Sequence, residues 1–123
     1  MLELTAKLKA TPFKLTLDDD SVVELKATEF TIGDITRLVE LQKPIFENAG
    51  EGNLVKVNPI MFTRVMCSVK YAETGEYYWP GDLADFESNQ YPKGMLDSLI
   101  GVVSTLNPVP TGEDTLDSKK NNS

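Results

Sequence analysis

The chain opens with a strict alternation of apolar and polar residues. In residues 2–10 the even positions are apolar and the odd positions are polar, which is the period of a strand with one apolar face. The same period returns in residues 13–17 and 22–27. The aspartates at 18–20 favour a tight turn between these two segments, because aspartate hydrogen-bonds its own backbone. We therefore predict two or three antiparallel strands in this part of the chain.

A helical period replaces the alternation from Thr31 onward. Thr31 and Asp34 are spaced as in a capping box, which predicts that a helix begins here. Pro44 should kink or end this helix, because proline lacks an N–H and clashes with the preceding turn. The positions expected on its buried stripe are Ile32, Ile35, Leu38, Val39, Gln42, Ile45 and Phe46.

A second helix is predicted to begin at Asn58, which caps it, and Pro59, which suits the first helical position. Residues 60–72 are apolar on most of the helical circumference, so we expect this helix to be the most buried one, and Gly75 to end it. Asp82 is suited to cap a short helix that runs through Phe86.

The last helix is predicted from Pro92 to Leu106, and Asn107-Pro108 should stop it. Residues 108–123 lack both period and aromatic side chains, which is typical of a disordered tail. The predicted architecture is α+β, with an N-terminal β-hairpin or small antiparallel sheet followed by three to four helices. Residues 1–107 would form a single domain. The apolar stripe of the last helix comprises Met95, Leu96, Leu99, Ile100, Val103 and Leu106.

Charge and composition narrow the classes of partner. The chain has 123 residues and a formal net charge of −7, which disfavours binding to nucleic acid and to anionic membranes. A single cysteine, Cys67, fits a reducing cytoplasm. No apolar stretch approaches the ~18 residues that a membrane span needs. We therefore expect a cytoplasmic protein that binds neither nucleic acid nor membrane.

Catalytic chemistry is hard to find in the sequence. Histidine is absent, which removes the commonest general base and transition-metal ligand. The aspartates at 18–20 lack the spacing of a calcium loop, and we read them as a solvated turn. Cys67 lies among apolar residues, with Arg64 and Lys70 expected to point outward, and we read it as a small buried hydrophobe. We expect no cofactor, no metal and no enzymatic activity.

The candidate residues for partner binding are aromatic or apolar. Tyr77, Tyr78 and Trp79 are consecutive on a predicted loop, and such residues either anchor protein interfaces or fold back onto the core. Both readings stay open. The remaining candidates are Phe86, Leu41, which falls off the buried stripe of the first helix, and Met61.

Several segments together resemble the tail assembly chaperones of long-tailed bacteriophages. They are "TPFKLTLDDDSVVELKATEFT", "YYWPGDLADFESNQYP", "MLDSLIGVVSTLNP" and the polar tail. The resemblance is one of size, element order, acidity and ending. It implies a non-enzymatic protein of the host cytoplasm that self-associates, binds the helical tape measure protein, keeps it soluble, and is absent from the mature virion.

The resemblance also implies a second, longer product. In many members a programmed ribosomal frameshift extends some copies with another domain, through which the major tail tube protein is a possible partner. Lys119 and Lys120 are the expected frameshift position, because lysine codons can form an unbroken run of adenines. Two alternatives stay open for the chain: a structural tail-completion or tube-associated phage protein, and an acidic mimic of nucleic acid.

Overall fold

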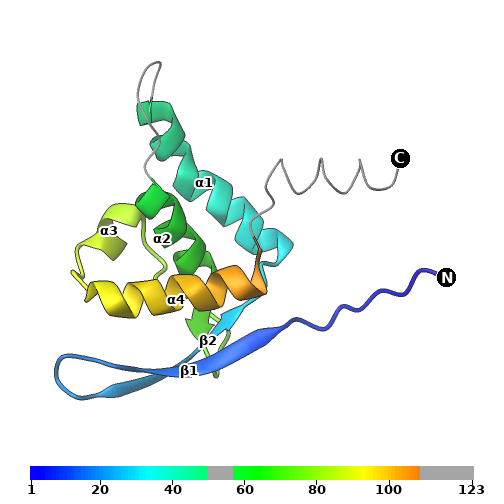
Figure 1. Cartoon of the computed structure of the whole chain (residues 1–123), viewed down its shortest axis with the longest axis horizontal. Helices are drawn as coiled ribbons and strands as arrows, with labels where there is room; N and C mark the ends of the chain where they lie inside the picture. The colour runs from blue at the N-terminus through cyan, green and yellow to red at the C-terminus, as the bar shows by residue number, and fades with distance from the viewer. Residues whose placement is uncertain (50–56, 109–123) are drawn as a thin grey trace.

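The computed structural model describes residues 1–49 and 57–108, and these form a three-stranded sheet with helices (Figure 1). Within that part of the chain there are four helices, so the predicted α+β class is confirmed. The predicted tail from residue 109 onward and the frameshift position at Lys119 and Lys120 lie outside the described residues. The elements are β1 (Ala10–Thr16), β2 (Val22–Thr28), α1 (Ile32–Ala49), α2 (Val57–Ser68), β3 (Val69–Tyr71), α3 (Leu83–Glu87) and α4 (Lys93–Leu106).

The predicted hairpin is formed by β1 and β2, which pair antiparallel from Ala10 opposite Thr28 to Thr16 opposite Val22. The aspartate turn joins them, and Asp20 takes the left-handed backbone conformation at φ 68°. Ser21 donates from both its N–H and its hydroxyl to Asp19 Oδ1, at 3.0 and 2.6 Å. The turn prediction is therefore confirmed.

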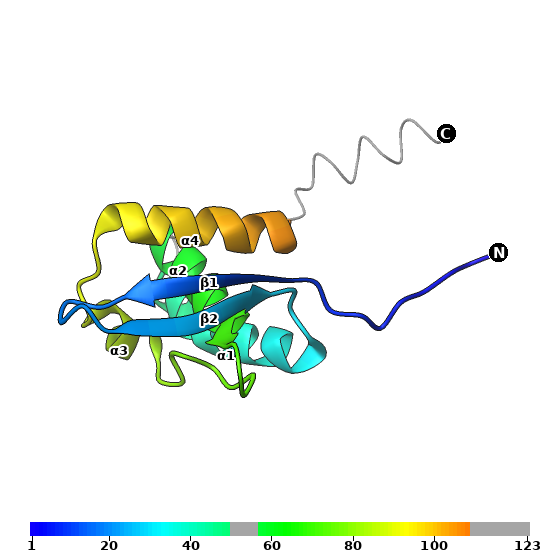
Figure 2. The same cartoon turned by 90° about the horizontal axis from the view of Figure 1, so that it is seen from below.

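The first predicted strand is wrong. Residues 1–9 form an extended arm instead, which leaves the body at the N-terminal end of β1 (Figure 2). The last backbone contact between the arm and the sheet is from the Glu29 N–H to the Lys9 oxygen, at 3.0 Å. The alternation is present, but no strand lies beside it, so the apolar side chains of Leu2 and Leu4 stay exposed.

The second helix is shorter than predicted, because the chain turns into β3 at Val69. β3 pairs antiparallel with β2, with Val69 opposite Ala27 and Tyr71 opposite Leu25. The glycine expected to end the helix belongs to the following turn, where Gly75 has a φ of 77°. The local pattern fitted a helix, but the open edge of β2 offers backbone partners that only the folded chain brings near.

The core lies between the sheet, α2 and α4. α2 supplies Val65, Met66 and Cys67, all fully buried, so the prediction that it is the most buried helix is confirmed over its actual length. The apolar stripe of α4 faces inward as predicted. The capping box at Asp82 and Asp85 is also present. Among the described residues no helix is both long and apolar enough to cross a membrane.

The buried side of helix α1 is rotated about the helix axis from the one predicted. Of the expected buried stripe, Leu38 is buried and Gln42 and Ile45 are half-buried, while Ile32, Val39, Phe46 and Ile35 are 89%, 59%, 54% and 45% exposed. Leu41, expected off the stripe, packs against the core. The helix runs on through Pro44 to Ala49, so the proline does not end it.

Candidate interaction surface and the polar cluster beneath it

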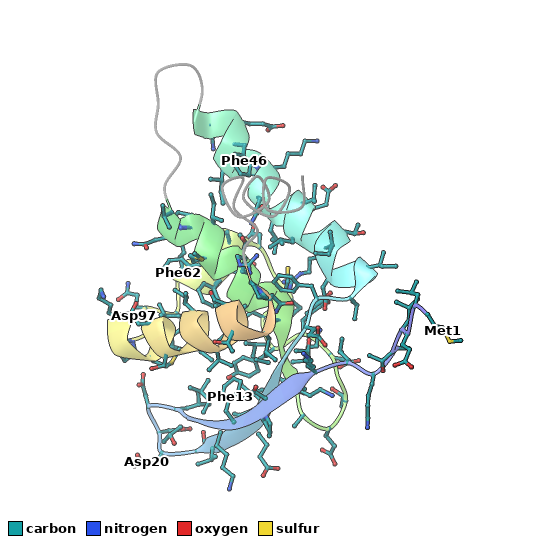
Figure 3. The ribbon with its side chains drawn as sticks, turned by 45° about the vertical axis from the view of Figure 1, so that its right-hand side comes forward. Met1, Phe13, Asp20, Phe46, Phe62 and Asp97 are labelled. Atoms are coloured by element: carbon teal, nitrogen blue, oxygen red, sulfur yellow. The ribbon has the colours of Figure 1, made fainter. Side chains whose placement is uncertain are left out.

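The outward face of α1 carries an apolar stripe that no residue in the described part of the chain covers. We call Ile32, Ile35, Val39 and Phe46 the α1 stripe; their spacing of three, four and seven residues places them on one side of the helix. Figure 3 labels Phe46 on the part of α1 far from the sheet. A contiguous apolar strip on a helix is the kind of surface that receives another apolar segment.

The inward face of α1 is polar at its first turns. Asp34 is 2% exposed. Its Oδ2 lies 2.6 Å from Lys70 Nζ, and its Oδ1 accepts a 2.5 Å hydrogen bond from the Tyr77 hydroxyl. The Thr31 N–H also donates to Oδ2, at 2.9 Å, and the Thr31 hydroxyl accepts from the Asp34 N–H. The predicted capping box is therefore present, and its carboxylate has a second function as a buried ion-pair partner.

Lys70 was expected to point outward, and this prediction is wrong. Lys70 lies in β3 and is 7% exposed. Its ammonium donates to the Thr28 hydroxyl at 2.6 Å as well as to Asp34. Arg64 also points inward, with its guanidinium 5.1 Å from the Phe30 ring centroid. Lys70 lies inside because the Thr28 hydroxyl and the Asp34 carboxylate accept hydrogen bonds from its ammonium. Arg64 points inward because the face of the Phe30 ring attracts its guanidinium.

The pKa of Asp34 reflects two opposing effects. Burial raises the pKa of its carboxyl, but the hydrogen bonds from Lys70, Tyr77 and the Thr31 backbone, with the charge of Lys70, outweigh burial and bring the pKa below its ordinary value. The carboxylate of Asp34 is thus charged at neutral pH. The same environment raises the pKa of the Tyr77 phenol, first through burial and then through its bond to Asp34.

Arg37 provides the second polar connection of α1. Its Nη1 donates to the Met66 oxygen at 2.7 Å, and its Nη2 donates to the Gly81 oxygen at 3.2 Å and to the Trp79 oxygen. The guanidinium stacks on the Tyr77 ring at 4.2 Å from the centroid. One side chain thereby satisfies carbonyls at the end of α2 and in the following connector. These bonds determine which face of α1 is buried.

The aromatic candidates for partner binding lie mostly inside the fold. Trp79 and Phe86 are 7% and 2% exposed, with ring centroids 4.9 Å apart. Tyr77 and Tyr78 are half-buried. The Trp79 indole N–H donates to the Tyr91 hydroxyl at 3.1 Å. The alternative of core packing is therefore confirmed for Trp79, and Phe86 is in the core as well.

The two other candidates have different positions. Leu41 is half-buried and packs against the core from α1, so little of it faces outward. Met61 is half-buried on α2 and does not belong to the core cluster. A partner-binding function for these six residues stays a prediction. The α1 stripe was missed as a surface because its period was read as the buried side.

A hollow of about 730 Å³ lies beside the polar cluster, lined among others by Leu8, Lys26, Tyr71 and Pro80. Of its four charged lining residues, Asp34 and Lys70 pair with each other within the fold, and the other two are Lys26 and Glu76. The thiol of Cys67 is buried, and burial raises its pKa to about 11, which keeps it protonated at neutral pH. Within residues 1–49 and 57–108 no group of acidic or cysteine side chains is arranged to hold a metal ion.

Comparison with known proteins adds no relative: no protein-family model, no curated protein and no solved structure matches this chain. The arrangement described above is that of an acidic α+β domain whose first helix presents an apolar stripe to solvent. Its function must therefore be argued from that surface.

Proposed function

We propose that this chain is a tail assembly chaperone of a long-tailed bacteriophage. In this function it binds the tape measure protein in the host cytoplasm, keeps it soluble during tail assembly, and does not remain in the mature virion. The observation that carries the proposal is the uncovered α1 stripe on a protein of net charge −7.

The physical argument concerns a long helical client. Such a client exposes apolar strips that would otherwise aggregate, and an apolar strip on a second helix can cover them at helical spacing. The net negative charge of the bound copies then keeps the complex dispersed. The polar cluster supports this use, because Asp34 and Arg37 hold α1 in place while its outer face stays free.

Co-expression tests the proposal. The tape measure protein encoded in the same genome is expressed with and without the chain, and the soluble fraction of the client is measured. We expect the chain to raise that fraction several-fold, and the variant Ile35→Asp/Val39→Asp to abolish the effect. Both residues are exposed, so the variant should fold, which its circular dichroism checks. Val57→Asp is the matched control, because Val57 is 65% exposed and lies on α2.

Two results would contradict the proposal. One is a client whose solubility does not change with the chain. The other is a stoichiometric amount of the chain in purified tails, which would identify it as a structural tail-completion or tube-associated protein. A separate measurement concerns the longer product: intact masses from the gene with its native downstream DNA should include a species that diverges near Lys119 and Lys120.

A further inference from the structure

We propose that the α1 stripe of one copy is covered by the N-terminal arm, residues 1–9, of a second copy, in a reciprocal two-fold dimer. The dimer is that of the purified chain without a client, and it does not rest on the identity of any client. In it, the arm covers a surface that the monomer exposes.

The first residues of the arm expose apolar side chains that the described part of the chain does not cover. Leu2 and Leu4 are 80% and 86% exposed, and Leu8, which also lines the hollow beside the polar cluster, is 45% exposed. Their shared parity places them on one side of an extended segment. When two exposed apolar surfaces cover each other, apolar area is removed from water, and this stabilises the assembly.

The lengths of the two surfaces agree. Residues 2–8 of an extended arm span roughly 20 Å at ~3.3 Å per residue. The α1 stripe from Ile32 to Phe46 spans roughly 21 Å at ~1.5 Å per residue. The arm can therefore lie along the stripe from end to end.

Charge also favours the pairing. The arm carries Lys7 and Lys9 against a single acidic residue, Glu3, in a chain whose net charge is −7. Helix α1 displays two acidic residues, Glu40 and Glu47, and one basic residue, Lys43, on its exposed surface. A cationic arm is attracted to the acidic body of another copy, and the attraction weakens with added salt.

The geometry favours exchange between copies over a fold-back within one. The arm leaves the body at the end where α1 begins, since Glu29 bonds to Lys9 only three residues before Ile32 (Figures 1 and 2). To reach its own α1 stripe the arm would have to reverse sharply. Residues 1–11 contain no glycine, asparagine, aspartate or proline. The Thr5 hydroxyl accepts from the Lys7 N–H at 3.1 Å, and with this local bond the arm still points away from α1 (Figure 1). Two copies related by a two-fold axis at this end can instead exchange arms.

Sedimentation of the full chain over a concentration series tests the dimer. We expect a concentration-dependent dimer, and a rise in its Kd of ~100-fold or more in Leu2→Ser/Leu4→Ser, because each copy loses two apolar contacts. Ile35→Ser/Val39→Ser should have an effect of similar size. The control Val22→Ser/Val57→Ser removes two valines that are 54% and 65% exposed elsewhere, and should leave Kd unchanged.

Each other outcome overturns the inference. A monomeric wild type at all concentrations, or arm variants that still dimerise, removes the arm as the occupant. A dimer lost with the arm variant but kept with the α1 variant places the arm on some other surface.

Cross-linking distinguishes exchange from fold-back. Leu4→Cys/Val39→Cys is prepared in nitrogen-15-labelled and unlabelled forms, which are mixed, allowed to exchange and oxidised. Disulfide-linked peptides with one labelled and one unlabelled half support exchange. Links confined to equal labels show an arm folded onto its own helix and overturn the inference. The native Cys67 is buried and does not compete.

Discussion

Helices α1 and α4 carry apolar residues at similar spacing and use them in opposite ways. In α4 the stripe that includes Leu99 and Val103 faces the core, with these two residues 6% and 1% exposed. In α1 the corresponding stripe faces solvent, and Asp34 and Arg37 face inward. The two helices differ in what lies beneath them. Helix α4 packs apolar side chains on α2 and β2. Helix α1 packs Leu38 and Leu41 toward the body, but its inner face also meets Lys70, Tyr77 and three backbone carbonyls.

This difference shows that a helical period identifies a helix more safely than it identifies the buried face. A buried carboxylate that finds a lysine, a phenol and a backbone N–H is charged and fully bonded. Its presence on the inner face turns the apolar residues of the other face outward. The outward stripe of α1 is thus a consequence of the polar cluster, and both can be tested by substitution.

The largest effect should come from the ion pair under α1. Lys70→Met leaves Asp34 buried without its cation, and should reduce the free energy of unfolding by about 3–5 kcal/mol. Urea unfolding measures the change. Lys26→Met is the control, because Lys26 lies directly opposite Lys70 on the neighbouring strand but is only half-buried. Equal effects of the two variants would show that the ion pair does not hold α1.

The next effect should come from the inward stripe of α4. Leu99→Ala removes a side chain that is 6% exposed and should cost about 2–4 kcal/mol, because a cavity remains in the core. The measurement is again urea unfolding. A loss below about 1 kcal/mol would place Leu99 at a site that collapses readily, and would weaken the contrast with α1.

Acid should weaken the hold on α1 in a way that depends on Asp34. Because the pKa of Asp34 is lowered in the fold, its contribution is fully present above its unfolded pKa of about 3.9 and is lost as pH falls through the folded pKa. The difference in urea midpoint between the wild type and Asp34→Asn should therefore shrink between neutral pH and pH values below about 4. A difference that stays constant over this range would contradict the charged pair.

The smallest effect on stability should come from the outward stripe of α1. In dilute monomeric protein, Ile35→Ala and Val39→Ala should each change the free energy of unfolding by no more than about 0.5 kcal/mol, because both side chains are already exposed. The same urea titration used for Leu99→Ala gives the comparison directly. A loss of 2 kcal/mol or more, roughly that of a core site, would mean that the stripe is covered within the monomer.

Local sequence signals predicted the parts of the fold that depend on near neighbours. The aspartate turn, the capping boxes at Thr31 and Asp82, and the helix that ends at Leu106 all follow from residues a few positions apart. The sequence also predicted the burial of Cys67 correctly. In these cases the local backbone hydrogen bonds and the apolar pattern of the sequence favour the same structure.

Most of the errors concern partners that are distant in sequence. β3 forms because residues 69–71 meet β2, and the buried side of α1 is rotated toward Asp34 because Asp34 meets Lys70, 36 positions later. Residues 1–9 have the period of a strand, but no described strand pairs with them. For the candidate site, aromatic composition left Trp79 open between surface and core and favoured Phe86 as a binding residue, and both side chains are core residues in the fold.

The first residue after α4 has a consequence for how the protein is made. The side chain of Asn107 accepts from the Phe30 N–H at 2.7 Å and donates to the Thr28 oxygen at 3.0 Å, across 77 and 79 positions of the chain. A ribosome adds ~5–20 residues per second. The corner between β2 and α1, where Thr28 and Phe30 lie, is therefore synthesised about 4–16 s before the Asn107 side chain that bonds to it. During that interval the emerging hairpin and first helix are open to proteases and to one another, and a nascent chain that stops short of Asn107 never closes that corner.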